Sequence, residues 1–189
     1  MRLTRTLILP LLLPAIFGTT VFLDKRLADD KAARIFGKMT YHIDDALDKK
    51  DITLVNGEHK EWELHVRYAD RYLYGDFNHD ALQDAAVMLV ENTGGNQDWY
   101  TLAFLMNDGQ RLTHHATIYL DDRAIIHSLR VKNGKVFVDM YVHQPGDCHG
   151  GPTKRLREWY EYPGRGVFAS RIGTYIFGEI TEGVKGESG

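Results

Sequence analysis

The chain has 189 residues, of which 43% are hydrophobic and 26% charged, and this composition excludes a disordered or wholly membrane-embedded chain. A formal net charge of −3 without a long Lys/Arg run gives no sign of a nucleic-acid surface, so we expect no nucleic-acid partner. The single cysteine, Cys148, excludes an intramolecular disulfide, which a domain of this size does not require.

The N-terminal segment has the pattern of a signal peptide or signal anchor. Arg2 and Arg5 precede an uncharged, mostly apolar stretch, residues 6–23, whose length is at the lower edge of what crosses a hydrocarbon core. The best cleavage position, after Gly18, has the bulky Ile16 at the minus-three position. We therefore predict that residues 6–23 are retained as a transmembrane helix in contact with lipid, and a cleaved signal peptide is the alternative.

The charges around this segment predict its orientation. Arg2 and Arg5 place the N-terminus in the cytoplasm by the positive-inside rule, so everything after Leu23 lies outside. The expected location is the inner (cytoplasmic) membrane, with one transmembrane pass and a periplasmic domain.

Composition divides the chain into three parts. Residues 25–36 contain good helix formers and end at Gly37, a plausible C-cap, which predicts a helical stalk that continues the anchor. The anchor and stalk thus occupy residues 1–37, a β domain occupies 38–180, and residues 181–189 form a Gly- and Glu-rich flexible tail. A short helical turn is expected at residues 43–47.

Asn-Gly and Asp-Gly pairs predict hairpins in the β domain. Asn56-Gly57, Asp108-Gly109 and Asn133-Gly134 each separate runs rich in β-branched and aromatic residues. Beside the third pair, the apolar face is predicted to contain two alternating sets: Ile125, His127, Leu129 and Val131, then Val136, Val138, Met140 and Val142.

Two continuous apolar runs, residues 85–90 and 102–106, are typical of central strands covered on both faces. Further strands are expected at residues 63–68, 112–119, 156–162 and 174–180. The predicted fold is mainly β: an antiparallel sandwich or partly open barrel of about seven to nine strands, preceded by one N-terminal transmembrane and stalk helix.

One acidic loop has the spacing of a cation site. Asp76, Asn78, Asp80 and Asp84 fit D-x-N-x-D-x-x-x-D, and Leu82 would add its carbonyl oxygen, so the five residues are candidate Ca²⁺ ligands. The loop has Ala81 where a left-handed turn normally uses Gly. The alternative is an Asx-rich turn whose side chains cap their own backbone.

Three segments together resemble a known family. They are GDFNHDALQDAAVMLVENTGG from Gly75, YLDDRAIIHSLRVKNGKVFVDMYVHQPGD from Tyr119, and Pro152-Thr153. They are similar to the GDLNGDGxxDAAV…ENxGG…GDRVxIxSL…VDMxxHxPxD motifs of a family of bacterial secreted or lipid-anchored domains of unknown function, over roughly residues 37–162. The resemblance implies an extracytoplasmic β domain and no established activity. Many members have adjacent cysteines before the Pro-Thr pair, where this chain has Gly150-Gly151.

Other polar residues favour structural roles. His143, Cys148 and His149 lie close in sequence, but their spacing matches no standard zinc pattern, and a Gly-rich loop is the simpler interpretation. His114 and His115 should point to opposite faces of a strand. His127 is expected to be a hydrogen-bonded core histidine. The neighbouring carboxylates Asp44-Asp45 and Asp121-Asp122 should diverge.

These observations leave three functional hypotheses. The first is a membrane-anchored, non-enzymatic accessory or scaffold protein that associates with membrane or periplasmic subunits. The second is a calcium-responsive binding module, and the third is an unrecognised hydrolase, which is the weakest because no nucleophile–base pair can be named.

Overall fold

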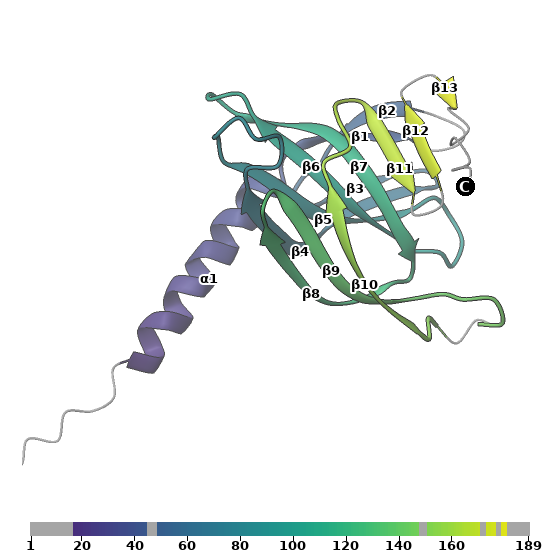
Figure 1. Ribbon diagram of the computed structural model, residues 1–189, viewed down its shortest axis with the longest axis horizontal. Coiled ribbons are helices and arrows are strands. Elements are labelled where there is room, and N and C mark those ends of the chain that lie inside the picture. Colours follow the sequence, from purple (N-terminus) through teal and green to yellow (C-terminus); the bar gives the residue numbers. More distant parts are fainter. Residues whose placement is uncertain (1–16, 45–48, 148–150, 171–172, 177–178, 181–189) are drawn as a thin grey trace, which may run out of the picture.

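The computed structural model describes residues 17–44, 49–147, 151–170, 173–176 and 179–180 (Figure 1). This part of the chain contains one helix, α1 (Phe17–Phe36), followed by thirteen strands. The strands are β1 (Thr40–Asp44), β2 (Lys49–Thr53), β3 (Glu58–Glu61), β4 (Leu64–Gly75), β5 (Asp84–Asn92), β6 (Trp99–Asn107), β7 (Leu112–Asp122), β8 (Ile125–Lys132), β9 (Lys135–Val142), β10 (Lys154–Glu161), β11 (Val167–Ser170), β12 (Gly173–Ile176) and β13 (Glu179–Ile180).

The described strands form three sheets. The largest has eight strands in the order β13-β12-β11-β7-β6-β5-β4-β3, the second has the order β10-β9-β8, and β1 pairs with β2. Every pairing is antiparallel except that of β11 with β7, which is parallel. The prediction of a mainly β, antiparallel fold is confirmed, and these strands stack as sheets without closing into a barrel.

The central strands of the eight-stranded sheet, β5 and β6, are buried on both faces. One core cluster fills the space between this sheet and β8–β10, with Phe104 and Met140 fully buried at its centre. A second cluster lies on the opposite face, where the β1–β2 hairpin and the end of α1 cover β4, β5 and β6. Residues 85–90 of β5 are accordingly buried without interruption, which confirms the prediction for this apolar run.

All three predicted tight turns are present. Asn56 and Gly57 have φ values of 54° and 89°, and Asn133 and Gly134 have values of 52° and 69°, as a type I′ turn requires. The Asn133-Gly134 turn also packs closely, since a Cβ atom at Gly134 would lie 2.6 Å from the His79 ring. This contact holds the β8–β9 hairpin against the acidic loop.

The predicted face of β8 is wrong at Ile125 and His127, whereas Leu129 and Val131 stand opposite the buried Val138 and Val136 of β9, on the predicted side. Ile125 is 52% exposed and His127 is also exposed, whereas Ile126 is buried. A β-bulge between Ile126 and Ser128 adds one unpaired residue, and this changes which residues alternate toward the core. On β9 the predicted core residues Val136, Val138, Met140 and Val142 are all buried.

The prediction of a helical turn at residues 43–47 is wrong for residues 43 and 44, which belong to strand β1. Ile43 belongs to β1 and is buried in the second core cluster, because it alternates with the buried Tyr41. Residues 45–47 lie outside the described residues.

Helix α1 ends at Phe36. The Gly37 amide donates to the Ala33 carbonyl at 2.9 Å, and the chain then turns into β1. Figure 1 shows the helix projecting from the sheets, with its C-terminal end against them. Among the described residues no helix is both long enough and apolar enough to cross a membrane. Residues 6–16 of the predicted span and the predicted tail, residues 181–189, lie outside the described part.

Candidate functional site

The acidic loop between β4 and β5 uses its side chains to hold its own backbone. The two Asp76 carboxylate oxygens accept hydrogen bonds from the amides of Asp80 and Ala81, both at 3.1 Å. Asp80 Oδ1 accepts from the Leu82 amide at 2.8 Å, and Asn78 Nδ2 donates to Asp80 Oδ2 at 2.8 Å. These contacts are those of Asx turns.

Asp84 has a different role from the other candidate ligands. It is fully buried, and its two oxygens accept from the amides of Phe77 and Asn107, each at 2.9 Å. Asp84 therefore ties the loop to the turn after β6. In the described part of the chain, no group of three or more His, Cys, Asp or Glu side chains is arranged to hold a metal ion. The hydrogen bonds of the loop do not exclude a calcium ion, because each carboxylate oxygen has a second lone pair. Calcium binding therefore stays a prediction.

Ala81 has the left-handed backbone of the position at which such loops normally use Gly. Its φ is 67°, in the left-handed region, and His79 has a φ of 62°. A non-glycine residue in this region costs ~1–2 kcal/mol. The loop's side-chain hydrogen bonds hold this strained backbone in place.

His143 forms a pair with Asp121. Its Nδ1 lies 3.2 Å from Asp121 Oδ2, and its backbone amide donates to the same oxygen. The neighbouring Asp122 instead accepts from the Asp98 amide and from Arg123, so the two carboxylates diverge as predicted. Cys148 and His149 lie outside the described residues, and the predicted lack of a zinc site there is not tested.

His114 and His115 contact different parts of the fold. The His42 amide donates to His114 Nδ1 at 3.0 Å, so the proton of this ring is on Nε2, which donates to the Ala116 carbonyl at 3.0 Å. Burial lowers the pKa of His114 to about 4, and its ring is neutral. His115 Nδ1 instead lies 3.3 Å from the Tyr162 hydroxyl.

Asp51 and His42 form a pair beside His114 that the sequence did not predict. Asp51 Oδ1 lies 2.8 Å from His42 Nδ1, in a recess of about 360 Å³ between the β1–β2 hairpin and the start of β7. Strand pairing brings the two residues together, since His42 and Asp51 face each other across the hairpin. Asp51 is largely exposed, and the recess contains no serine or cysteine.

The three-stranded sheet has a surface, here called the outer face, that points away from the core. On β9, the residues of this face alternate with the buried residues. Their partners across the strands lie on β8 and β10. The residues of the outer face are Ile125, His127, Ser128, Arg130, Lys132, Lys135, Phe137, Asp139, Tyr141, Arg155, Arg157, Trp159 and Glu161. In Figure 1 this sheet is the layer that carries the labels β8, β9 and β10.

Aromatic rings and a guanidinium group stack on the outer face. The Phe137 and Trp159 rings are 5.1 Å apart, and the Arg130 guanidinium carbon lies 5.0 Å from the Phe137 ring centre. His127 packs on Tyr141 at 5.3 Å. Trp159 is nevertheless 49% exposed, so much of this aromatic surface faces solvent.

The charges of the outer face are ordered around one carboxylate. Asp139 accepts hydrogen bonds from Arg155 Nε and Nη2 at 2.9 and 2.8 Å, and Arg157 Nε lies 3.4 Å from the same group. The Arg155 bonds lower the pKa of Asp139 to about 2. With five cationic and two anionic side chains, the outer face has a net charge of +3, in a chain whose net charge is −3.

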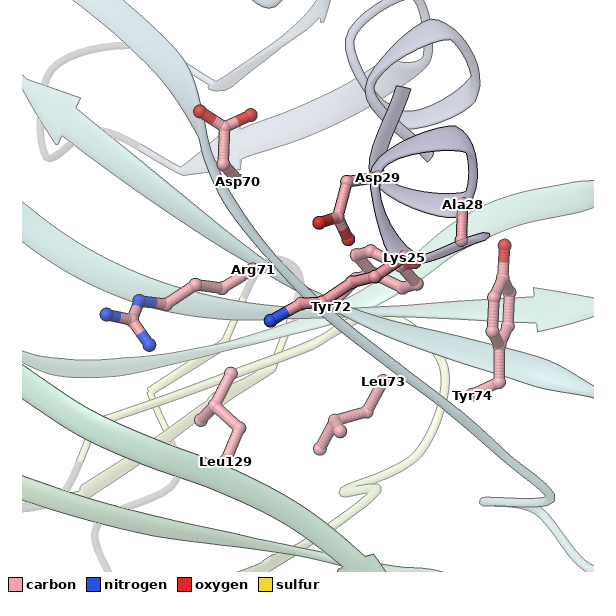
Figure 2. A pocket seen from close by; sticks show the side chains of 9 residues that line it. All are labelled: Lys25, Ala28, Asp29, Asp70, Arg71, Tyr72, Leu73, Tyr74 and Leu129. Carbon is pink, nitrogen blue, oxygen red and sulfur yellow. The ribbon is translucent and has the colours of Figure 1, made fainter. Parts of the chain in front are cut away.

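An open cleft of about 470 Å³ separates α1 from β4 (Figure 2). Lys25 and Asp29 reach into it from the helix, over Tyr72, and Leu73 and Leu129 line the opposite side. Asp70, Arg71 and Tyr74 complete the lining of the cleft together with Ala28.

A bulge in β4 shapes this cleft. The pairing passes from Tyr68–Leu89 to Tyr72–Val87, so residues 69–71 of β4 lie opposite the single residue Met88. Asp70 has a φ of 53° as a result. The Tyr72 ring packs 5.4 Å from Phe36, and burial, followed by the charge of Asp29, raises the pKa of Tyr72.

Comparison with known proteins gives no match for this chain: no protein-family model, no curated protein and no solved structure matches it.

Proposed function

We propose that this protein is a membrane-anchored, extracytoplasmic accessory protein that docks a partner protein through its outer face. Residues 6–23 hold it in the inner membrane, and its role is association rather than catalysis. The observation that carries the proposal is the exposed set of aromatic and arginine side chains on β8, β9 and β10. The resemblance to secreted and lipid-anchored bacterial domains is consistent with this location.

The composition of the outer face supports binding to a protein. Trp, Tyr and Arg are the residue types most enriched in the energetically dominant positions of protein interfaces. Trp159, Tyr141 and Arg157 are such residues, and the stacked Phe137 and Arg130 hold the centre of the surface in a fixed arrangement. A preordered surface loses less side-chain entropy when it binds.

The charge of the outer face indicates an acidic partner. Asp139 pairs with Arg155 and Arg157, and Glu161 pairs with Lys135, so these two carboxylates offset only two of the five cationic side chains and leave a net charge of +3. An acidic surface of a membrane or periplasmic subunit complements this field and is guided to it at low ionic strength. Anchoring adds to this effect, because confinement beside a membrane partner raises the effective concentration.

Photo-crosslinking in intact membranes tests the proposal. A photoreactive amino acid replaces Trp159 in the full-length chain, and in a matched control it replaces Trp62, which is 90% exposed on the β3–β4 turn. We expect a discrete protein adduct from position 159 only, with an acidic partner identified by mass spectrometry. Arg157→Glu should abolish the adduct, and high salt should weaken it.

The same experiment can contradict the proposal. Equal labelling from positions 159 and 62, or an adduct that Arg157→Glu leaves unchanged, would show that the outer face is an ordinary solvated surface. Circular dichroism of Arg157→Glu must match that of the wild type, and this is expected because Arg157 is exposed.

A further inference from the structure

We infer that the cleft between α1 and β4 binds a zwitterionic lipid headgroup of the phosphatidylethanolamine type from the membrane in which the protein is anchored. This inference rests on the anchor in the proposed function. It assigns a ligand to a site separate from the outer face.

The position of the cleft along the helix puts it at the depth of the headgroups. The predicted span ends at Leu23, and Lys25 and Asp29 follow it by two and six residues in the continuous helix α1. At ~1.5 Å per residue, these two residues lie roughly 3 and 9 Å beyond the hydrocarbon core. The headgroup layer extends about 5–8 Å beyond that core on each side, so the Lys25 backbone lies within it and the Asp29 backbone just beyond its outer edge.

The side chains around the cleft match both charges of such a headgroup. Lys25 and Arg71 are cationic and suit a phosphate, whereas Asp29 and Asp70 are anionic and suit a primary ammonium group. Tyr72 and Tyr74 add aromatic faces and hydroxyl groups, a combination favoured at membrane interfaces. In the described part of the chain, none of these four charged groups has an ion pair or hydrogen bond.

The two carboxylates distinguish between lipid classes. Phosphatidylglycerol has a phosphate for Lys25 and Arg71 but no ammonium group for Asp29 and Asp70. Phosphatidylcholine has the charge but no N–H group to donate to a carboxylate. Asp70 lies in the β4 bulge, with its backbone in the left-handed region.

Native mass spectrometry of the full-length protein in mild detergent tests the inference. Phosphatidylethanolamine, phosphatidylcholine and phosphatidylglycerol with identical acyl chains are added in separate titrations. We expect phosphatidylethanolamine to bind most tightly, and Asp29→Asn combined with Asp70→Asn to weaken it about tenfold. Asn tolerates the left-handed conformation of residue 70, so this variant should keep its fold.

Asp30→Asn provides the matched control, since Asp30 is exposed on the same helix and does not line the cleft. It should leave lipid binding unchanged. Equal affinity for the three lipids, or no loss of affinity in the double variant, would overturn the inference while leaving the anchor and the outer face intact. An intact mass corresponding to a chain that begins near Thr19 would instead reject the anchor, and the lipid site with it.

Discussion

Phe36 should determine how firmly α1 is attached to the sheets. Its side chain is fully buried, and its ring lies 5.9, 5.4 and 6.0 Å from the rings of Tyr68, Tyr72 and Tyr74. An aromatic side chain buries ~150–250 Å², which at ~25 cal/mol/Å² gives an upper value of roughly 4–6 kcal/mol. Phe36→Ala should therefore destabilise the fold by about 3–5 kcal/mol, the usual range for a large-to-small core substitution.

Urea unfolding followed by circular dichroism measures this loss. Leu27→Ala on the same helix is the control, because Leu27 is 59% exposed and its replacement should change the free energy of unfolding by less than ~0.5 kcal/mol. A loss below about 1 kcal/mol for Phe36→Ala, or equal losses for both variants, would show that α1 does not pack on the sheets as described.

Three further predictions concern His114 and the acidic loop of residues 76–84. The folded-state pKa of His114, about 4, lies below its ordinary value of 6.5, so the unfolded chain binds the additional proton. Stability should fall between pH 6.5 and 4, by roughly 2 kcal/mol at pH 5, and chemical denaturation of His114→Asn should show a smaller fall. Ala81→Gly should raise the free energy of unfolding by about 1 kcal/mol, because it removes left-handed strain, and an unchanged midpoint would count against that strain. If the loop binds Ca²⁺, a concentration 100-fold above Kd stabilises the wild type by ~2.7 kcal/mol but not Asp80→Ala, whereas an unaltered wild-type melting temperature in millimolar calcium rejects the site.

Features encoded by neighbouring residues were predictable from the sequence. Asn56-Gly57 and Asn133-Gly134 form tight turns because their residues accept positive φ values wherever they occur. The apolar run of residues 85–90 indicated a strand covered on both faces, since polar residues would otherwise alternate with apolar ones. The spacing of the acidic loop aligned Ala81 with a position that normally uses Gly, but it left open whether Ala81 would be left-handed or the loop would change.

Features that depend on pairing between distant segments were not predictable in the same way. The bulge at His127 exists only in relation to β9, so simple alternation assigned this residue to the wrong face. The pairing of β10 with β9 brings Arg155 and Arg157 to Asp139, and no local pattern gives that register. The outward position of Phe137 and Tyr141 could have been read from the alternation in β9, but that surface gains its cationic character only from β8 and β10.

The outer face and the cleft are linked through β8. Leu129 lines the cleft on one side of this strand, and the next residue, Arg130, stacks on Phe137 on the other side. A headgroup held in the cleft would restrict the rotation of the sheets about α1, whose buried contacts come from its last turns, at Ala32 and Phe36. The outer face would then meet a membrane partner in a limited set of orientations. An anchored domain with a fixed orientation gains more effective concentration from its tether than one that rotates freely, so the two proposed sites reinforce a single role in association.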